Sequence, residues 1–208
     1  MNPSTGIWSS VASVYDWQLA LERPAFRAVV DLAAPQASDE LLDVGTGTGG
    51  VLRELAGRPS RPVRAVGVDS SSEMLAAAGH RLAEWELVAA DARALPFTDD
   101  SFDVVTASYV LHVLDRGDRA RVLEEIYRVL RPDGRLATVT PALQRTALGR
   151  LLLRPVAAVA ERSSGLASGL RSLDPRAEIG EHFTVRRVRW VNRGYPSVCV
   201  LASPRPVA

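Results

Sequence analysis

The most informative segment of this 208-residue chain is Leu41-Leu42-Asp43-Val44-Gly45-Thr46-Gly47-Thr48-Gly49-Gly50. It reads as an apolar strand that ends in a glycine-rich turn and opens a helix. Glycines let the backbone turn tightly and approach a ligand closely, and the helix that follows presents N–H groups without helical partners at its start. The segment therefore predicts a cofactor-binding loop at the carboxyl end of a strand.

Two patterns fit this loop. Counted from Gly45 it satisfies G-x-G-x-x-G, and Asp69 lies about twenty residues on, where a dinucleotide site wants an acid for ribose hydroxyls. Counted from Asp43 it satisfies D-x-G-x-G-x-G. Asp43 separates the two, because a carboxylate at the end of the strand would repel a pyrophosphate but favours a cationic ligand.

Further motifs follow in order. They lie at Trp85–Ala92, Leu95–Val105, Ala107–His112 and Glu125–Leu136. Together with the first segment, they resemble the successive motifs of class I S-adenosylmethionine-dependent methyltransferases, in the branch that includes the quinone-biosynthesis C-methyltransferases. The resemblance covers residues 40 to 141, and it implies S-adenosylmethionine as cofactor, S-adenosylhomocysteine as product and a small-molecule methyl acceptor.

The expected fold is α/β, a doubly wound, mostly parallel seven-stranded sheet with an antiparallel C-terminal hairpin. Five apolar runs alternate with helical stretches, which predicts parallel strands with helices on both faces; the runs lie near 40–45, 63–68, 86–90, 102–107 and 135–140. The hairpin comprises Phe183–Val191 and Ser197–Ser203, and its parity predicts a bulge near Arg186 or Arg187. The resemblance implies that the last strand lies between the fifth and sixth.

The chain is expected to form a single domain over 1–208. Within it we expect an N-terminal helical lid with two helices over 8–34 that break near Pro24, and a helix that stops at the turn Pro132-Asp133-Gly134. The four expected parts are the lid 1–36, the cofactor-binding core 37–141, a helical acceptor-side segment 142–182 and the hairpin 183–208.

Composition narrows the function classes. The formal net charge is +1, and no apolar segment reaches the ~20 residues of a membrane span, so we expect a cytoplasmic protein. Residues 142 to 193 carry 10 Arg against 4 acidic residues. This excess predicts either a face for an anionic acceptor or peripheral lipid contact, or an ordinary solvated face. The near-neutral net charge disfavours a nucleic-acid partner, and no spacing of residues suits a metal site. Cys199 is expected to be buried. A homodimer is possible.

The resemblance implies a role for each residue of the cofactor site. The loop cradles the methionine part, Asp69 takes the ribose hydroxyls, and Ser70 or Met74 borders the adenine. Asp91 and the N–H of Ala92 read the adenine edge. The expected cofactor-binding residues are Asp43, Gly45, Thr46, Gly47, Gly49, Asp69, Ser70, Met74, Asp91, Ala92 and Ser108.

Several of these residues have plainer interpretations. Asp69 suits the cap of a helix that starts near residue 71 or 72, and Asp91 suits an ordinary loop. Met74 suits the core. Asp43 either accepts loop N–H groups or holds the ammonium of the ligand, and the two roles are compatible.

Two residues are candidates for catalysis. Tyr15 resembles a tyrosine in the N-terminal helix of many relatives, and it also suits a half-buried helix position. His112 has a pKa range suited to accepting a proton from the acceptor, and it also suits a structural role or an adenine-side contact. The expected reaction is an in-line methyl transfer, for which orientation alone contributes about 7 to 11 kcal/mol. The rival hypotheses are a non-catalytic S-adenosylmethionine-binding module and an NAD(P)-dependent oxidoreductase.

Overall fold

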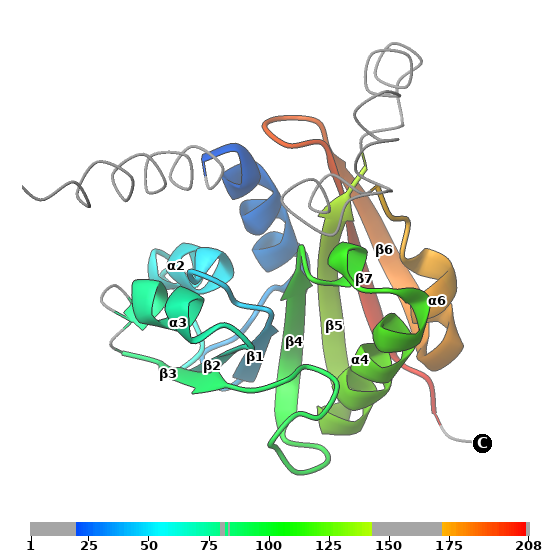
Figure 1. Cartoon of the computed structure of the whole chain (residues 1–208), viewed down its shortest axis with the longest axis horizontal. Helices are drawn as coiled ribbons and strands as arrows, with labels where there is room; N and C mark the ends of the chain where they lie inside the picture. Colours follow the sequence, from blue (N-terminus) through cyan, green and yellow to red (C-terminus); the bar gives the residue numbers. More distant parts are fainter. Residues whose placement is uncertain (1–19, 80–81, 83, 143–171, 207–208) are drawn as a thin grey trace, which may run out of the picture.

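The computed structural model describes residues 20–79, 82, 84–142 and 172–206. These residues form a seven-stranded sheet with helices on both faces, in the strand order β3-β2-β1-β4-β5-β7-β6 (Figure 1). The strands are β1 (Glu40–Val44), β2 (Arg64–Asp69), β3 (Glu86–Ala89), β4 (Phe102–Ser108), β5 (Leu130–Pro141), β6 (Phe183–Val191) and β7 (Ser197–Pro204).

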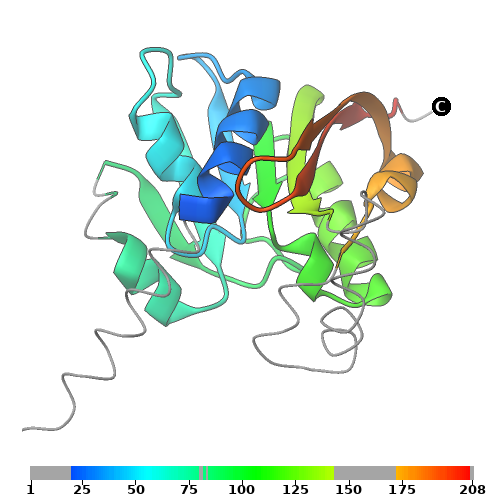
Figure 2. The same cartoon turned by 90° about the horizontal axis from the view of Figure 1, so that it is seen from above.

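The labelled helices follow the strands in the expected alternation. They are α2 (Gly50–Ala56), α3 (Ser72–Gly79), the 3-10 helix η1 (Leu111–Val113), α4 (Arg116–Val129) and α6 (Arg176–His182). A further helix covers 20–33 and is called helix 20–33 below. Helices α4 and α6 pack on one face of the sheet, and helix 20–33 and α2 pack on the other (Figure 2).

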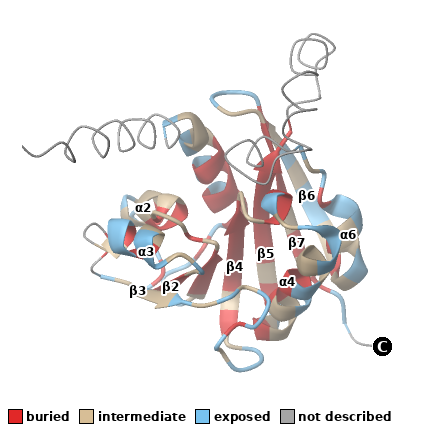
Figure 3. Cartoon of the chain, in the orientation of Figure 1, coloured by how far each residue is buried: buried red, intermediate tan, exposed pale blue. Residues whose placement is uncertain are grey.

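The core explains why the central strands are apolar on both faces. Leu42 and Val105 pack with the α4 side, whereas Leu41 and Val104 pack with the side of helix 20–33. All four side chains are completely buried, so the middle of the sheet is sealed between two helical layers (Figure 3). This burial gives the strand ends fixed positions from which polar side chains can project.

The sheet topology confirms the sequence-based prediction. β1 to β5 run parallel, β7 is antiparallel to both β5 and β6, and the last strand lies between the fifth and sixth. The register of β6 against β7 shifts between Val185 and Arg187, which confirms the predicted bulge. Cys199 is completely buried on β7, as expected.

One local prediction, the helix break near Pro24, is wrong. Pro24 lies inside helix 20–33 and does not break it. The ring removes one helical hydrogen bond, but burial of the next residues, Ala25 and Phe26 among them, outweighs this loss. Helix α4 ends at Val129, just before Pro132-Asp133-Gly134, as predicted. These three residues are part of β5 and lie where its register against β4 shifts, between Leu130 and Arg135.

Other predicted features lie outside the described residues. These are the helix before residue 20, with Tyr15, and the apolar helical segment over 143–171. In the described part of the chain, no helix combines the length and the apolar character that crossing a bilayer requires.

Candidate functional site

The glycine-rich loop after β1 adopts the backbone that its sequence predicts. Gly45, Gly47 and Gly49 have φ angles of 68°, 55° and 81°, in the left-handed region that favours glycine. A Cβ on Gly47 would meet no atom within 4 Å, so the space beside this residue is open. A Cβ on Gly45 would lie 2.8 Å from the Cβ of Val110, which shows how closely the loop approaches the segment after β4.

Asp69, the last residue of β2, holds the loop in place. Its Oδ2 accepts a hydrogen bond from the N–H of Gly47 at 2.8 Å, and its Oδ1 accepts one from the N–H of Ser71 at 2.9 Å. The hydroxyl of Ser71 in turn accepts a hydrogen bond from the N–H of Met74 in the first turn of α3, at 3.2 Å. Asp69 therefore orders the turn before α3 and also lies at the carboxyl end of β2.

Asp43 is a buried carboxylate beneath the loop. It is 1% exposed, and its Oδ1 accepts a hydrogen bond from the hydroxyl of Thr106 at 2.7 Å. Burial raises the pKa of Asp43 from 3.8 to about 6, while the hydroxyls of Thr106 and Thr46 act in the opposite direction and the charge of Asp69 adds to the rise. The carboxylate therefore stays ionised at neutral pH only at an energetic cost.

Two adjoining cavities open at the carboxyl ends of the strands. The Asp91 cavity has a volume of about 350 Å³, and the Asp43 cavity has a volume of about 370 Å³. Four residues line both cavities, which therefore share a wall: Gly45, Asp69, Tyr109 and Val113. The combined volume is in the range that takes a ligand of drug or cofactor size.

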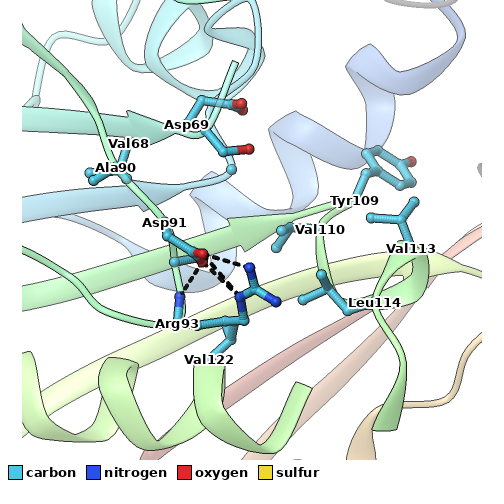
Figure 4. A pocket seen from close by; sticks show the side chains of 13 residues that line it. Val68, Asp69, Ala90, Asp91, Arg93, Tyr109, Val110, Val113, Leu114 and Val122 are labelled. Carbon is cyan, nitrogen blue, oxygen red and sulfur yellow. Dashed lines mark hydrogen bonds and ion pairs between the residues drawn. The ribbon is translucent and has the colours of Figure 1, made fainter. Parts of the chain in front are cut away.

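The Asp91 cavity carries a carboxylate held by an arginine (Figure 4). The guanidinium of Arg93 donates hydrogen bonds to both carboxylate oxygens of Asp91, the shortest at 2.7 Å, and a further one to Asp118 in α4 at 3.0 Å. These contacts lower the pKa of Asp91 to about 2. Asp91 therefore keeps its charge and its orientation across the whole range of physiological pH.

The Asp43 cavity contains a buried hydroxyl with an unmet hydrogen-bonding capacity. Ser108, the last residue of β4, is 8% exposed, and its Oγ has no hydrogen-bond partner among the described residues. Buried polar atoms in native proteins are nearly always paired with protein, water or ligand. The orphaned hydroxyl is therefore available for a hydrogen bond to water or to a polar ligand atom in this cavity.

Tyr109 separates the two cavities in a strained conformation. Its φ is 56°, which is uncommon for an aromatic residue, and its N–H donates to the carbonyl of Val139 at 2.9 Å. Its hydroxyl lies 2.7 Å from the hydroxyl of Ser197 on β7, and its ring packs edge-on against Phe26 at 5.8 Å. Neighbours on both sides therefore fix the position of this ring.

The structure brings most of the predicted cofactor residues to these cavities. The Asp91 cavity is lined by Ser70, Asp91 and Ala92, the Asp43 cavity by Asp43, Thr46, Gly47, Met74 and Ser108, and both by Gly45 and Asp69. Gly49 lines neither cavity; it precedes α2 as its N-cap.

Of the two predicted catalytic residues, only His112 lies in the part of the chain that the structure describes. His112 is 4% exposed in η1 and packs edge-on against Tyr109 at 6.0 Å, and it lines neither cavity. Tyr15 lies outside the described residues.

The cavity-lining residues that sequence reasoning missed include Glu22, Phe26 and Arg93. The first two belong to helix 20–33, and no motif marks them. Arg93 had a signal, because an arginine two residues after an acid in a loop can fold back onto it.

Comparisons with known proteins agree with this geometry. A family model described as "Methyltransferase domain" matches residues 42–138. The demethylmenaquinone methyltransferase of Roseiflexus castenholzii is 34% identical over an alignment 208 positions long, which covers 91% of this chain and 85% of the relative. The chain belongs to the class I S-adenosylmethionine-dependent methyltransferases.

Another relative of this methyltransferase matches a smaller part of the chain. The ubiquinone/menaquinone biosynthesis C-methyltransferase UbiE of Dinoroseobacter shibae is 39% identical over 158 residues, which cover 67% of this chain and 62% of that relative. A solved S-adenosylmethionine-dependent methyltransferase from Aquifex aeolicus has a TM-score of 0.65 at 20% identity, with 88% of this chain and 89% of that chain covered. The likeness to the solved structure concerns the fold.

The cavities of this methyltransferase suit its cofactor. The open space beside Gly47, the orphaned hydroxyl of Ser108 and the carboxylates of Asp69 and Asp91 provide a cradle rich in hydrogen-bond acceptors. A ligand that carries a net positive charge and several donor groups fits this set better than a diphosphate does.

Proposed function

We propose that this methyltransferase transfers a methyl group from S-adenosylmethionine to a small, lipophilic, ring-containing acceptor and releases S-adenosylhomocysteine. The observation that carries the proposal is the pair of adjoining cavities, which share Asp69 and Tyr109 and contain carboxylates at the ends of three neighbouring strands. Such a row of acids suits an adenosine with an attached cationic amino-acid part.

Each part of the cofactor has residues suited to it. Asp91 and the N–H of Ala92 suit the donor and acceptor atoms of the adenine edge, and Asp69 suits the ribose hydroxyls. The glycine loop and the hydroxyl of Ser108 suit the amino-acid part in the Asp43 cavity. These assignments keep the predicted division of the site.

The cofactor, when bound, supplies an electrophilic methyl group on a sulfonium. The contribution of the protein is then alignment and exclusion of water, which together suffice for large rate enhancements without a dedicated base. Tyr109 is the residue best placed to align the reactants, because it is rigid and lines both cavities. Its phenol has a pKa raised by burial and stays protonated, so it acts as a hydrogen-bond donor and not as a base.

An apolar wall supports a lipophilic acceptor. Val113 is 42% exposed although it is a large apolar residue, and it lines both cavities; Phe26 and Val110 extend the same wall. An exposed apolar group beside a cofactor site suits an apolar substrate. The relatives from Roseiflexus castenholzii and Dinoroseobacter shibae carry quinones in their names, so we propose an acceptor of the quinol type.

The remaining predictions about the setting of the reaction stay open. A proton acceptor role for His112 would require a path past the ring of Tyr109, and Tyr15 awaits a direct test. The cytoplasmic location, a homodimer and a peripheral contact with lipid also stay predictions.

The test is transfer of a labelled methyl group. Purified protein is incubated with S-adenosylmethionine that carries a deuterated methyl group and with a lipid extract of bacterial cells, and products are analysed by mass spectrometry. We expect a lipophilic product heavier by one deuterated methyl group, present with the wild type and absent with Asp69→Ala. A product found only in the water-soluble fraction would contradict the lipophilic acceptor, and cofactor binding without any product would favour a non-catalytic binding module.

A further inference from the structure

Helix 20–33 contributes a third carboxylate to the Asp43 cavity. Building on the proposed function, we infer that Glu22 is the charged partner of the ammonium in the amino-acid part of the cofactor. The inference adds a residue from the covering helix to a site otherwise built from strand ends and the glycine loop. It also gives this helix a role in cofactor affinity as well as in covering the sheet.

Glu22 is placed on the wall of the cavity by its helix. It lines the Asp43 cavity and is half-buried, one helical turn before Phe26 on the same face. The ring of Phe26 packs so closely on the loop that a Cβ on Gly50 would lie 2.6 Å from it, and it also contacts Tyr109 edge-on. The face that carries Glu22 therefore lies directly over the glycine loop.

Contacts with the β6–β7 turn hold the first described turn of helix 20–33 in place beside Glu22. The N–H of Tyr195, in the turn between β6 and β7, donates to the carbonyl of Leu21 at 2.8 Å. Gly194 has a φ of 71°, and a Cβ there would lie 2.1 Å from the same carbonyl oxygen, so only glycine permits this approach. On the other side Arg27 pairs with Glu54 of α2 at 3.3 Å. These contacts hold Glu22 in register with the cavity.

The other two carboxylates of the cavity belong to the ends of strands. Both oxygens of Asp69 accept hydrogen bonds from backbone N–H groups. Asp43 is buried against Thr106, and burial disfavours its charged form. Glu22 differs from both, because it approaches from the helical layer and its charge is felt by the phenols of Tyr109 and Tyr195, whose pKa values rise partly for this reason.

A second observation, independent of Glu22, shows an unmet hydrogen-bonding capacity at this end of the site. The buried hydroxyl of Ser108 lines the same cavity and lacks a hydrogen-bond partner among the residues that the structure describes. A ligand ammonium placed between this hydroxyl and the Glu22 carboxylate would be able to donate to both, which meets the need of a buried acceptor and of a cation.

Calorimetry with two ligands tests the inference without any methyl acceptor. The ligands are S-adenosylhomocysteine and its deamino analogue, which keeps the carboxylate and replaces the ammonium by hydrogen. We expect Glu22→Gln to weaken S-adenosylhomocysteine about tenfold and to leave the affinity for the deamino analogue within twofold. The matched control is Glu124→Gln on the exposed face of α4, which should change neither affinity.

The outcomes separate this inference from the proposed function. If Glu22→Gln weakens both ligands equally, or neither, Glu22 does not recognise the ammonium and the inference is overturned. The same holds if Asp43→Asn alone removes the preference for the ammonium-bearing ligand. Failure of the wild type to bind either ligand would instead overturn the proposed function, and a thermal melt of each variant confirms that it is folded.

Discussion

The carboxylate of Asp69 accepts a hydrogen bond from the backbone N–H of Gly47, with 2.8 Å between Oδ2 and N, across 22 residues of sequence. This contact joins the end of β2 to the loop after β1, the two elements that a nucleoside-binding site needs to hold together. Because Asp69 also lines both cavities, one side chain shapes the loop and is available to the ligand. Two replacements, one that keeps an acceptor for the loop and one that does not, therefore separate loop geometry from ligand recognition.

Asp69→Ala and Asp69→Asn form the first pair of variants. The amide oxygen of Asn can still accept a loop N–H but makes weaker bonds to hydroxyls than a carboxylate does. We expect affinity for S-adenosylhomocysteine to fall roughly tenfold in Asp69→Asn and roughly a hundredfold in Asp69→Ala, measured by calorimetry. Equal affinity in all three proteins, with intact far-UV circular dichroism, would remove Asp69 from the binding site.

The buried carboxylate of Asp43 predicts a dependence of stability on pH. Its pKa is about 6 in the folded protein and 3.8 as the ordinary value, so the folded state binds the proton more tightly. The resulting stability is fully present below pH 4 and is lost as the pH rises through 6, up to about 3 kcal/mol from the size of the shift. Asp43→Asn should therefore gain stability relative to the wild type as the pH rises from 4 to 8.

Urea unfolding of both proteins at pH 5 and pH 8 measures this difference. The amide of Asn keeps an acceptor for the hydroxyl of Thr106, so packing changes little. If the free energies of unfolding of variant and wild type differ by the same amount at both pH values, folding does not shift the pKa of Asp43.

Gly194→Ala tests the anchor of helix 20–33. The added Cβ meets the carbonyl oxygen of Leu21 at 2.1 Å and the backbone has a φ of 71°, so we expect a loss of about 2 kcal/mol in the free energy of unfolding. In a chain of this size that corresponds to a fall of about 4 to 8 °C in Tm. Calorimetric melting of the variant measures the fall.

Gly180→Ala is the matched control for that variant. Gly180 lies inside α6, and a Cβ there would contact no atom within 4 Å, so alanine should stabilise the helix by about 0.5 to 1 kcal/mol. The two glycine-to-alanine changes are thus expected to shift Tm in opposite directions. A shift of the same sign in both would mean that the close approach of Gly194 to Leu21 carries no energetic weight.

The strand ends and the glycine loop were predictable because their signals are local. Asp43, Asp69 and Asp91 each follow an apolar run, and parallel strands bring such positions to one edge of a sheet. The continuity of helix 20–33 through Pro24 was not predictable, because it depends on burial against the sheet and not on propensity.

The position of Glu22 at the cavity was not predictable from the sequence for a related reason. Its place over the loop follows from contacts between the helix, α2 and the β6–β7 turn, which are far apart in sequence. His112 shows the opposite case, since its position after β4 suggested the cavity but η1 turns its side chain into the interior. Local patterns thus find the strand ends, whereas packing of the covering helices decides the rest of the wall.

The crystal structure of the protein with S-adenosylhomocysteine is the most direct test of the proposed site. We expect the adenine in the cavity beside Asp91, the ribose hydroxyls at Asp69, and the amino-acid part between the glycine loop and Glu22. A structure in which this ligand lies elsewhere, or in which NAD(P) occupies the loop with its diphosphate against Gly45–Gly49, would contradict the assignment of the cavities.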